Sequence, residues 1–203
     1  SLVAATMVKG YQGDNLADEE TIMACTKHLV LYGASEAGRD YNTVDVSRRS
    51  LYEVYFPPFY AAEKAGVATF MTSFNEVEGV PATANKYLYT DVLRDEWKFK
   101  GFVVTDYTAV NELIPHGIAA NEEEAAEKAV NAGIDMDMNG NVFIRNLPSL
   151  VKSRKVKEHV IDRAVRPILE MKFLLGLFDD PYRYLDSTRE KNTIMRPEFL
   201  QVA

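Results

Sequence analysis

The sequence predicts an α/β protein built on parallel strands, and three observations support this fold class. Four short apolar runs, each about as long as a strand, alternate with longer segments of helical periodicity. No pair of turn residues joins two of these runs as a hairpin, and no Gly-x-Gly-x-x-Gly turn follows any of them. Parallel strands need crossovers, so this order indicates successive βα units. Four units make half of a (β/α)8 TIM-like barrel, which needs about 250 residues.

The expected strands are apolar and rich in β-branched residues, and the expected helices are amphipathic segments bounded by turn residues. The strands are residues 23–31, 67–74, 101–105 and 133–138. The helices are residues 2–10, 47–65, 85–97, 112–115, 121–132, 142–152 and 156–175. Loops fill the intervals, including the stretch of small residues at 33–42 and the loop at 75–81.

Glycine and proline set the expected helix ends. Gly10 is expected to stop the first helix. Pro57 and Pro58 should divide the 47–65 segment into two pieces, the second beginning near Pro58, because a proline inside a helix removes a hydrogen bond and clashes one turn back. For the same reason Pro167 predicts a kink or break in the last helix.

Composition limits the classes of partner. The 203 residues are 47% hydrophobic and 26% charged with a net charge of −7, which suits one globular domain with a sizeable core. An acidic chain offers no basic face to nucleic acid, and the basic residues of 152–157 are expected to form a solvated face. No apolar run approaches the roughly 20 residues that cross a bilayer, so no membrane is expected. Cys25 is the only cysteine, which leaves no disulfide framework.

Polar side chains lie at the ends of three predicted strands. Asp106 follows the 101–105 strand, Asn75 follows the 67–74 strand, and Lys27 with His28 lies in the first strand. The carboxyl ends of barrel strands carry the chemistry in α/β barrel enzymes, so Asp106 is a candidate nucleophile, although Asp before a helix is also a common N-cap. A buried Lys27 needs a carboxylate or a ligand beside it, unless it reaches water from the strand end. His28 alone would be a core histidine, and its neighbour Lys27 strengthens the case for a site.

Other polar residues have weaker claims. Arg39 and Asp40 form either a local salt bridge, which we favour, or ligands for sugar hydroxyls. In the run Asp135–Met138 the two aspartates alternate with the two methionines. In a strand, one of these two pairs of like residues points inward and the other into the barrel wall. Two acids without a histidine do not predict a metal, whereas Met138 can form part of a pocket wall. His116 lies in a helical pattern and is assigned no chemistry.

Several motifs together resemble one enzyme family. They are the Lys27-His28 pair, GRDYNTVD at 38–45, TSFNEVEGVPA at 72–82, LRDEWKFKGFVVTD at 93–106 and GLFDDPY at 176–182. These segments, in this order, resemble the β-glucosidases of glycoside hydrolase family 3. The resemblance implies a retaining, exo-acting hydrolase that releases β-D-glucose from β-glucosides or glucan oligosaccharides through a covalent glycosyl-aspartate on Asp106. It implies no metal and no organic cofactor.

The resemblance also suggests which residues bind the sugar. The family's Lys-His pair, which binds sugar hydroxyls, maps to Lys27 and His28. We add Phe74, Tyr107, Met138 and Arg39 as substrate-binding candidates. Tyr107 stands where the family usually has Trp, and Phe74 where Tyr is common, which alters the pocket rim and removes a hydroxyl. The Lys-His-Phe-Pro-Gly-His-Gly motif of the N-acetylglucosaminidase branch is absent, so that branch is disfavoured.

Members of this family begin with four more barrel strands and continue into a second α/β domain that supplies the general-acid glutamate. We therefore expect residues 1–182 to be the C-terminal half of a catalytic barrel that lacks its first strands, and residues 183–203 to be a polar, irregular exit toward the missing domain. The chain alone is expected to be weakly active or inactive, and to be completed by both missing parts, from the same gene or a second polypeptide. The resemblance alone favours a periplasmic or secreted location.

Two other functions stay open at this point. A lysine on a barrel strand is also how Schiff-base lyases work, with Lys27 as the imine-forming residue. The third possibility is a non-catalytic fragment that binds sugar or serves as a scaffold.

Overall fold

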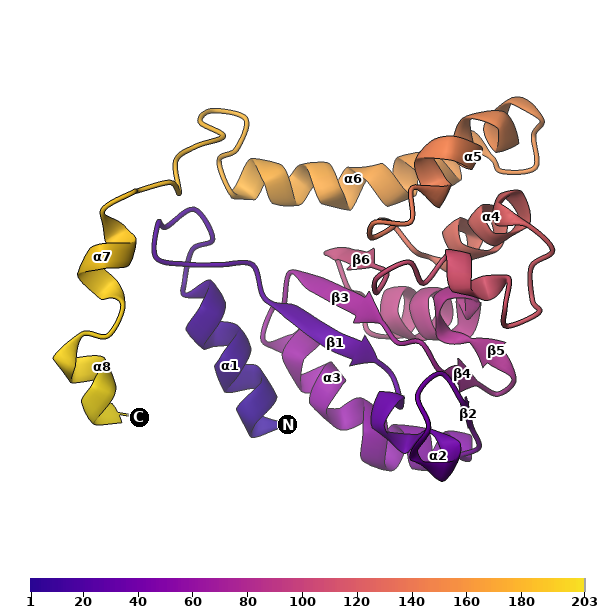
Figure 1. The fold of residues 1–203 in the computed structure, drawn as a ribbon, viewed down its shortest axis with the longest axis horizontal. Coiled ribbons are helices and arrows are strands. Elements are labelled where there is room, and N and C mark those ends of the chain that lie inside the picture. Colours follow the sequence, from indigo (N-terminus) through magenta and orange to yellow (C-terminus); the bar gives the residue numbers. More distant parts are fainter. Residues whose placement is uncertain (203) are drawn as a thin grey trace.

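The computed structural model describes residues 1–202 and has a central sheet of three parallel strands, in the order β1-β3-β6 (Figure 1). The strands are β1 (Cys25–Leu29), β3 (Thr69–Thr72) and β6 (Phe102–Val104). They are neighbours in the order in which they occur along the chain, as successive βα units produce. The predicted parallel α/β class is confirmed.

The expected fourth strand, residues 133–138, is reduced to one parallel bridge between Val104 and Met136. The N–H of Thr105 donates to the Met136 carbonyl at 2.9 Å, and the N–H of Met136 donates to the Val103 carbonyl at 3.1 Å. The ladder stops there because the next N–H on this face, that of Met138, donates to the Thr105 hydroxyl at 2.8 Å instead of to a backbone carbonyl. A side chain thus replaces the strand pairing at this point.

A second small sheet contains a hairpin, which the sequence reasoning missed. It consists of β2 (Thr43–Val44), β4 (Glu76–Val77) and β5 (Val80–Pro81), with β2 parallel and β5 antiparallel to β4. Glu78 and Gly79 join β4 to β5 with φ of 54° and 78°. Two central residues with positive φ are typical of the type I′ turn, which matches the twist of paired strands. The expectation of a plain loop at 75–81 was wrong because Glu-Gly is not among the usual sequence signals for this turn.

The helices match the expected positions more closely than the expected ends. They are α1 (Leu2–Gln12), α2 (Arg48–Ser50), α3 (Phe56–Lys64), α4 (Glu122–Ala132), α5 (Val142–Lys152), α6 (Glu158–Leu174), α7 (Arg189–Thr193) and α8 (Pro197–Val202), with π-helical stretches at Leu51–Tyr55 and Tyr87–Glu96. Short 3-10 turns lie at Tyr32–Ala34, Glu36–Gly38, Ala82–Ala84 and Asn111–Leu113. No helix within the described residues is long and apolar enough to cross a membrane.

Prolines and glycines interrupt the helices less than expected. Pro57 and Pro58 lie in the first turn of α3, but α2, the π-helical stretch Leu51–Tyr55 and α3 follow one another without a break, so the predicted division into two pieces was wrong. Helix α1 continues past Gly10 and ends only before Gly13, whose φ is 56°. Helix α6 runs through Pro167 as one helix (Figure 1), so the expected break was wrong. Pro167 is buried on the packed face of α6, and this packing holds the helix together where one hydrogen bond is lost.

The buried amide of Gln12 ties the end of α1 to the sheet. Its Oε1 accepts the N–H groups of Ala24 at 3.2 Å and Ala68 at 2.8 Å, which precede β1 and β3. Its Nε2 donates to the Gly66 carbonyl at 2.8 Å. These three bonds satisfy every strong polar atom of the side chain and explain why the helix extends past Gly10.

The two faces of the sheet differ in their apolar packing. Phe70 and Val103 belong to the main core, whereas Met71, Phe102 and Val104 form a small cluster with partly buried methionines. This division follows from the alternation of side chains along a strand. Helices α1 and α3 pack together near β1, while α4 packs against α5 and α6 toward β6 (Figure 1).

The C-terminal segment contains α7 and α8 instead of the irregular exit expected at 183–203. It returns to the loop after α1, where the Arg183 guanidinium donates to the Ala17 carbonyl at 2.7 Å. The Tyr184 hydroxyl donates to the Leu16 carbonyl at 2.8 Å. These bonds between the two ends of the chain could not be read from local sequence pattern.

Candidate functional site

The carboxyl ends of the parallel strands bring His28 and Asp106 together. The His28 Nε2 atom lies 3.1 Å from Asp106 Oδ2, and the two side chains are 22% and 17% exposed. Strand β3 lies between β1 and β6, so the two backbones are two strand spacings apart, about 10 Å. Both side chains must therefore lean over the end of β3, toward a common point in front of the strand ends.

Asp106 is held by its neighbours in a way that leaves one carboxylate oxygen for this contact. Its backbone N–H donates to the Thr72 hydroxyl, which ends β3, at 3.2 Å. Its Oδ1 accepts the N–H of Tyr107 at 2.7 Å. The next helical turn begins only at Asn111, so Asp106 is not the N-cap of a helix. The capping alternative is thereby removed.

The environment of His28 favours the neutral imidazole. Burial lowers the pKa of His28 below its usual value, and the positive charge of Lys27 lowers it further, while the Asp106 carboxylate opposes both effects. A neutral imidazole can donate its Nε2 hydrogen to Asp106 Oδ2 at the observed distance. His28 is therefore placed to orient the Asp106 carboxylate.

Aromatic rings continue outward from His28. The Tyr32 ring lies 4.8 Å from the His28 ring, Phe74 lies 6.1 Å from Tyr32, and Tyr41 lies 4.7 Å from Phe74, all between ring centroids. The Tyr32 hydroxyl donates to Asp40 Oδ2 at 2.9 Å. Burial and this hydrogen bond raise the pKa of Tyr32 to about 12, so its hydroxyl stays protonated. Phe74 thus reaches the site through Tyr32, which the sequence reasoning did not single out.

Lys27 does not have the buried, paired environment that its sequence position suggested. Its side chain is exposed and makes no ion pair with any residue from 1 to 202. Lys27 lies near the carboxyl end of β1, and its side chain reaches water there, as the alternative for this residue allowed. The expectation of a carboxylate beside Lys27 was wrong.

The other predicted residues lie around the site at different distances. Arg39 is exposed, and the favoured salt bridge with Asp40 is absent from the described part of the chain because Asp40 accepts hydrogen bonds from Tyr32 and from the Tyr41 N–H. Tyr107 is next to Asp106, but its ring is exposed. Met138 is joined to the segment after Asp106 through its backbone, whose carbonyl accepts the Thr108 N–H at 3.0 Å.

Sequence reasoning missed a polar contact that joins the second sheet to the segment after Asp106. The His116 Nδ1 atom lies 3.5 Å from Glu76 Oε1, and the Thr43 hydroxyl donates to Glu76 Oε2 at 3.0 Å. Asn75, the buried neighbour of Glu76, donates to the Val30 carbonyl at 3.2 Å. No local pattern marks His116, because its partners come from the hairpin region far away in sequence.

Asp135 supports β6. It forms a salt bridge with Arg94, and its Oδ2 accepts the Val103 N–H at 2.7 Å. Burial raises the pKa of Asp135 to about 6, against the opposing charge of Arg94. Within the described residues no three His, Cys, Asp or Glu side chains converge as a metal site would require.

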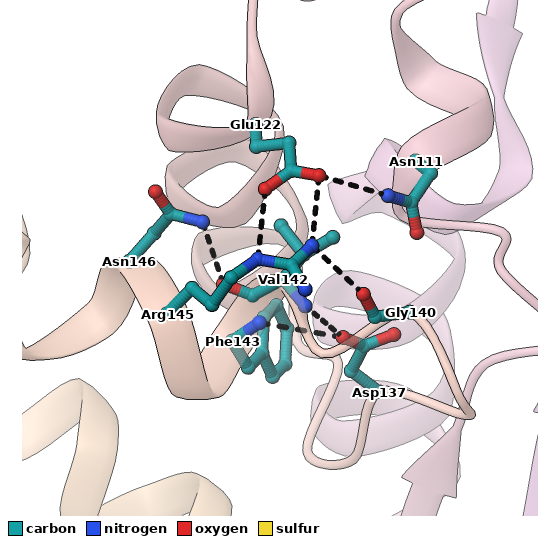
Figure 2. A network of polar contacts seen from close by, with 8 residues as sticks. All are labelled: Asn111, Glu122, Asp137, Gly140, Val142, Phe143, Arg145 and Asn146. Atoms are coloured by element: carbon teal, nitrogen blue, oxygen red, sulfur yellow. Dashed lines mark hydrogen bonds and ion pairs between the residues drawn. The ribbon is translucent and has the colours of Figure 1, made fainter.

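Asp137 begins helix α5 (Figure 2). Its Oδ2 accepts the N–H groups of Val142 at 2.7 Å and Phe143 at 3.3 Å. Arg145 of the same helix pairs with Glu122 of α4 at 2.8 Å (Figure 2). The two acids of the Asp135–Met138 run therefore support the strand before Asp106 and the helix α5 that follows.

A family model described as the glycosyl hydrolase family 3 N terminal domain matches residues 1–171. The chain belongs to glycosyl hydrolase family 3. A family relative from Salmonella typhimurium, a periplasmic beta-glucosidase, is 42% identical over 210 residues, which cover 100% of this chain and 28% of the relative. A putative beta-xylosidase from Formosa agariphila is 38% identical over 187 residues, which cover 90% of this chain and 25% of the relative.

Solved structures of the same family agree with this family 3 fold. A beta-glucosidase from Listeria innocua in complex with isofagomine has a TM-score of 0.92 at 44% identity, covering 97% of this chain and 28% of that one. An exo-beta-xylosidase in complex with a xylobiose aziridine activity-based probe has a TM-score of 0.78 at 31% identity, covering 89% and 25%. This family 3 chain therefore spans about a quarter of the length of these relatives.

Proposed function

We propose that this chain is part of a retaining, exo-acting glycoside hydrolase that releases β-D-glucose from β-glucosides or glucan oligosaccharides, with Asp106 as the nucleophile. The observation that carries the proposal is the 3.1 Å contact between His28 and Asp106 at the carboxyl ends of two strands that are not neighbours. The carboxylate there is partly exposed and caps no helix. It is thus available to a substrate that approaches the strand ends.

In this mechanism a carboxylate oxygen of Asp106 bonds to the anomeric carbon of the sugar, and the bond from that carbon to the leaving oxygen breaks. The electron pair of the broken bond goes to the leaving oxygen, which takes a proton from a general acid about 5 to 5.5 Å from the nucleophile. A water oxygen then bonds to the anomeric carbon while the ester bond to Asp106 breaks and its carboxylate is regenerated. The water proton goes to the group that acted as general acid in the first step, and the configuration is retained. The family resemblance assigns the general acid to a glutamate of a second α/β domain.

The residues around Asp106 have distinct proposed roles. Neutral His28 donates to the carboxylate and keeps it oriented. Lys27, whose side chain is exposed near the carboxyl end of β1, is available to sugar hydroxyls. Phe74 and Met138 form walls of the glucose pocket, and Tyr107 lies at its rim.

The three strands and the Met136 bridge are proposed to be half of a TIM-like barrel. Their spatial order matches their chain order, and His28 meets Asp106 across β3, which is what a sheet curling toward closure produces. An N-terminal half barrel and a C-terminal α/β domain would complete the site. The chain alone is then weakly active or inactive.

The relatives include both beta-glucosidases and beta-xylosidases. We favour glucose because the periplasmic beta-glucosidase is 42% identical and the putative beta-xylosidase 38%. The alternative of a Schiff-base lyase requires the missing half barrel to enclose Lys27, which is exposed in this chain, since an imine-forming lysine is activated in a desolvated pocket.

Covalent trapping tests the proposal in the complete enzyme that carries these residues. Incubation with a 2-fluoroglucoside, followed by digestion and mass spectrometry, is expected to place the sugar on Asp106. Asp106→Ala is expected to abolish hydrolysis, whereas Asp45→Ala, which removes an exposed carboxylate elsewhere, should not. A label on another residue, or full activity of Asp106→Ala, contradicts the nucleophile. A borohydride-reduced adduct on Lys27 would support the lyase, and binding without turnover would leave the sugar-binding role.

A further inference from the structure

We propose that Tyr89 is a positioning residue of the candidate site, whose hydroxyl fixes the carboxyl end of β1 so that His28 reaches Asp106. This role rests on the function proposed above, because it takes Asp106 as the nucleophile that His28 orients. Tyr89 belongs to the π-helical stretch Tyr87–Glu96 and acts on the nucleophile only through His28.

Strand β1 is irregular at the point where it presents His28. Its pairing with β3 shifts by one residue between Thr26 and Leu29, so the two residues between them stand opposite one residue of β3. This arrangement is a β-bulge, and His28 is one of the two residues in it. A bulge bends its strand and changes the direction of the side chains it carries. The direction of His28 toward Asp106 therefore depends on how the backbone is held on either side of the bulge.

The carbonyl just after the bulge is held mainly by Tyr89. The Tyr89 hydroxyl donates to the Leu29 carbonyl at 2.7 Å, whereas the Ser73 N–H donates to the same carbonyl at 3.3 Å. An O–H···O bond has its usual length near 2.7 Å, while 3.3 Å is long for an N–H···O bond, so the hydroxyl makes the stronger contact. Without it, the residue next to His28 would be held at its carbonyl by one long bond.

Tyr89 is itself firmly placed behind the sheet. It is fully buried, and burial raises the pKa of its hydroxyl well above the usual value, so the hydroxyl remains a donor. A Cβ added to Gly133, whose φ is 115°, would lie 3.1 Å from the Tyr89 Cβ, so this backbone packs directly against Tyr89. The neighbouring Thr90 hydroxyl donates to the Ala132 carbonyl at 2.9 Å. Tyr89 thus transmits the position of the packed helices to the end of β1.

The next carbonyl of the same segment has separate support from β3. The Val30 carbonyl accepts the Ser73 hydroxyl at 3.1 Å and the Asn75 amide at 3.2 Å, and both side chains are buried. These bonds remain when the Tyr89 hydroxyl is removed. Replacement of Tyr89 by phenylalanine should therefore loosen the bulge at His28 without unfolding the end of the strand.

A double-mutant cycle in the complete enzyme tests whether Tyr89 acts through His28. Tyr89→Phe is expected to lower kcat/KM for nitrophenyl β-glucoside about tenfold, the effect of losing one buried hydrogen bond that positions a reacting group. In the His28→Ala background the same change is expected to have almost no further effect, because no imidazole is left to position. Tyr87→Phe is the matched control on the same helix. It removes an exposed hydroxyl that donates to the Tyr52 hydroxyl at 3.3 Å, and it should change neither background.

The outcomes distinguish positioning from a general structural role. A loss that disappears in the His28→Ala background supports the proposal, because reduced stability would lower the activity of both backgrounds alike. The same fold-loss in both backgrounds, or no loss in either, overturns it. If Tyr89→Phe does not fold, Ser73→Ala, which removes the hydroxyl from the adjacent Val30 carbonyl, is taken through the same cycle with the same criteria.

Covalent labelling separates this role from the proposed function. If a 2-fluoroglucoside labels Asp106 while the effects of Tyr89→Phe and His28→Ala are independent, the positioning role alone has failed. If Asp106 is never labelled in the parent enzyme, the proposed function has failed, and the positioning role fails with it.

Discussion

Replacing Arg94 with methionine is expected to destabilise the protein by about 3–5 kcal/mol above pH 6. The Arg94 guanidinium contacts the Asp135 carboxylate, whose side chain is 1% exposed, and also donates to the Gly101 carbonyl at 2.6 Å. Removing one partner of a buried ion pair costs about 3–5 kcal/mol because the other charge stays buried alone. Asp135 of this pair also accepts the Val103 N–H of β6, so the loss of Arg94 loosens the strand that leads to Asp106.

The size of this effect should depend on pH. Burial raises the pKa of Asp135 from 3.8 to about 6 in the folded protein. A carboxyl group whose pKa is higher in the folded than in the unfolded protein stabilises the fold fully at pH values below its pKa in the unfolded protein. This stabilisation is lost as the pH rises through its pKa in the folded protein. A shift of this size corresponds to about 3 kcal/mol. Without Arg94 the carboxyl group prefers its neutral form still more, so the destabilisation by Arg94→Met should be smaller below pH 6 than above it.

Urea unfolding followed by circular dichroism, near pH 5 and near pH 8, measures both effects. Arg48→Met is the matched control, because Arg48 pairs with Glu78 at 3.0 Å while the two side chains are 60% and 45% exposed. An exposed pair of this kind is worth about 1 kcal/mol or less. The reasoning is refuted if Arg94→Met costs no more than the control near pH 8, or if its cost does not fall at low pH.

Three further changes test the support of the sheet and of the site. Gln12→Ala leaves two buried N–H groups and a carbonyl without partners and should lower the free energy of unfolding by about 3 kcal/mol; an unchanged urea midpoint would contradict this. Gly101→Ala places a Cβ 1.9 Å from the Ala68 carbonyl oxygen and should lower the free energy of unfolding by about 3 kcal/mol or more. Gly10→Ala meets open space in α1 and should raise the free energy of unfolding by about 1 kcal/mol in the same assay. Thr72→Val removes the acceptor of the Asp106 N–H and should lower kcat about tenfold in the complete enzyme; a fall in melting temperature alone would mean that Thr72 is only structural.

Much of the framework could be predicted from local pattern. Strands β3 and β6 are continuous apolar runs because both of their faces are buried, and such runs are visible in sequence. The position of Asp106 just after β6 follows from the same run. Helices α1, α3, α4, α5 and α6 were also found by periodicity, whereas α7 and α8 were missed. The end of α1 depends on Gln12, whose partners lie in distant segments.

The candidate site was only partly predictable. His28 and Asp106 were proposed from their places at strand ends, but nothing in the sequence shows that they meet across β3. Tyr32 was missed, and the favoured Arg39–Asp40 salt bridge was wrong, because the hydrogen bond of Tyr32 to Asp40 depends on the path of a loop that has no periodic pattern.

The sequence by itself determined the parallel α/β class, the family and the identity of the residues at the strand ends, since each of these depends on pattern along the chain. The tertiary structure decided which residues touch. It exposed Lys27 near the carboxyl end of β1, turned Glu78 and Gly79 into a hairpin and brought His28 to Asp106. The physical reason is that periodicity reports how much each residue is buried, whereas contacts between distant residues depend on strand order, on sheet edges and on the curvature of the sheet.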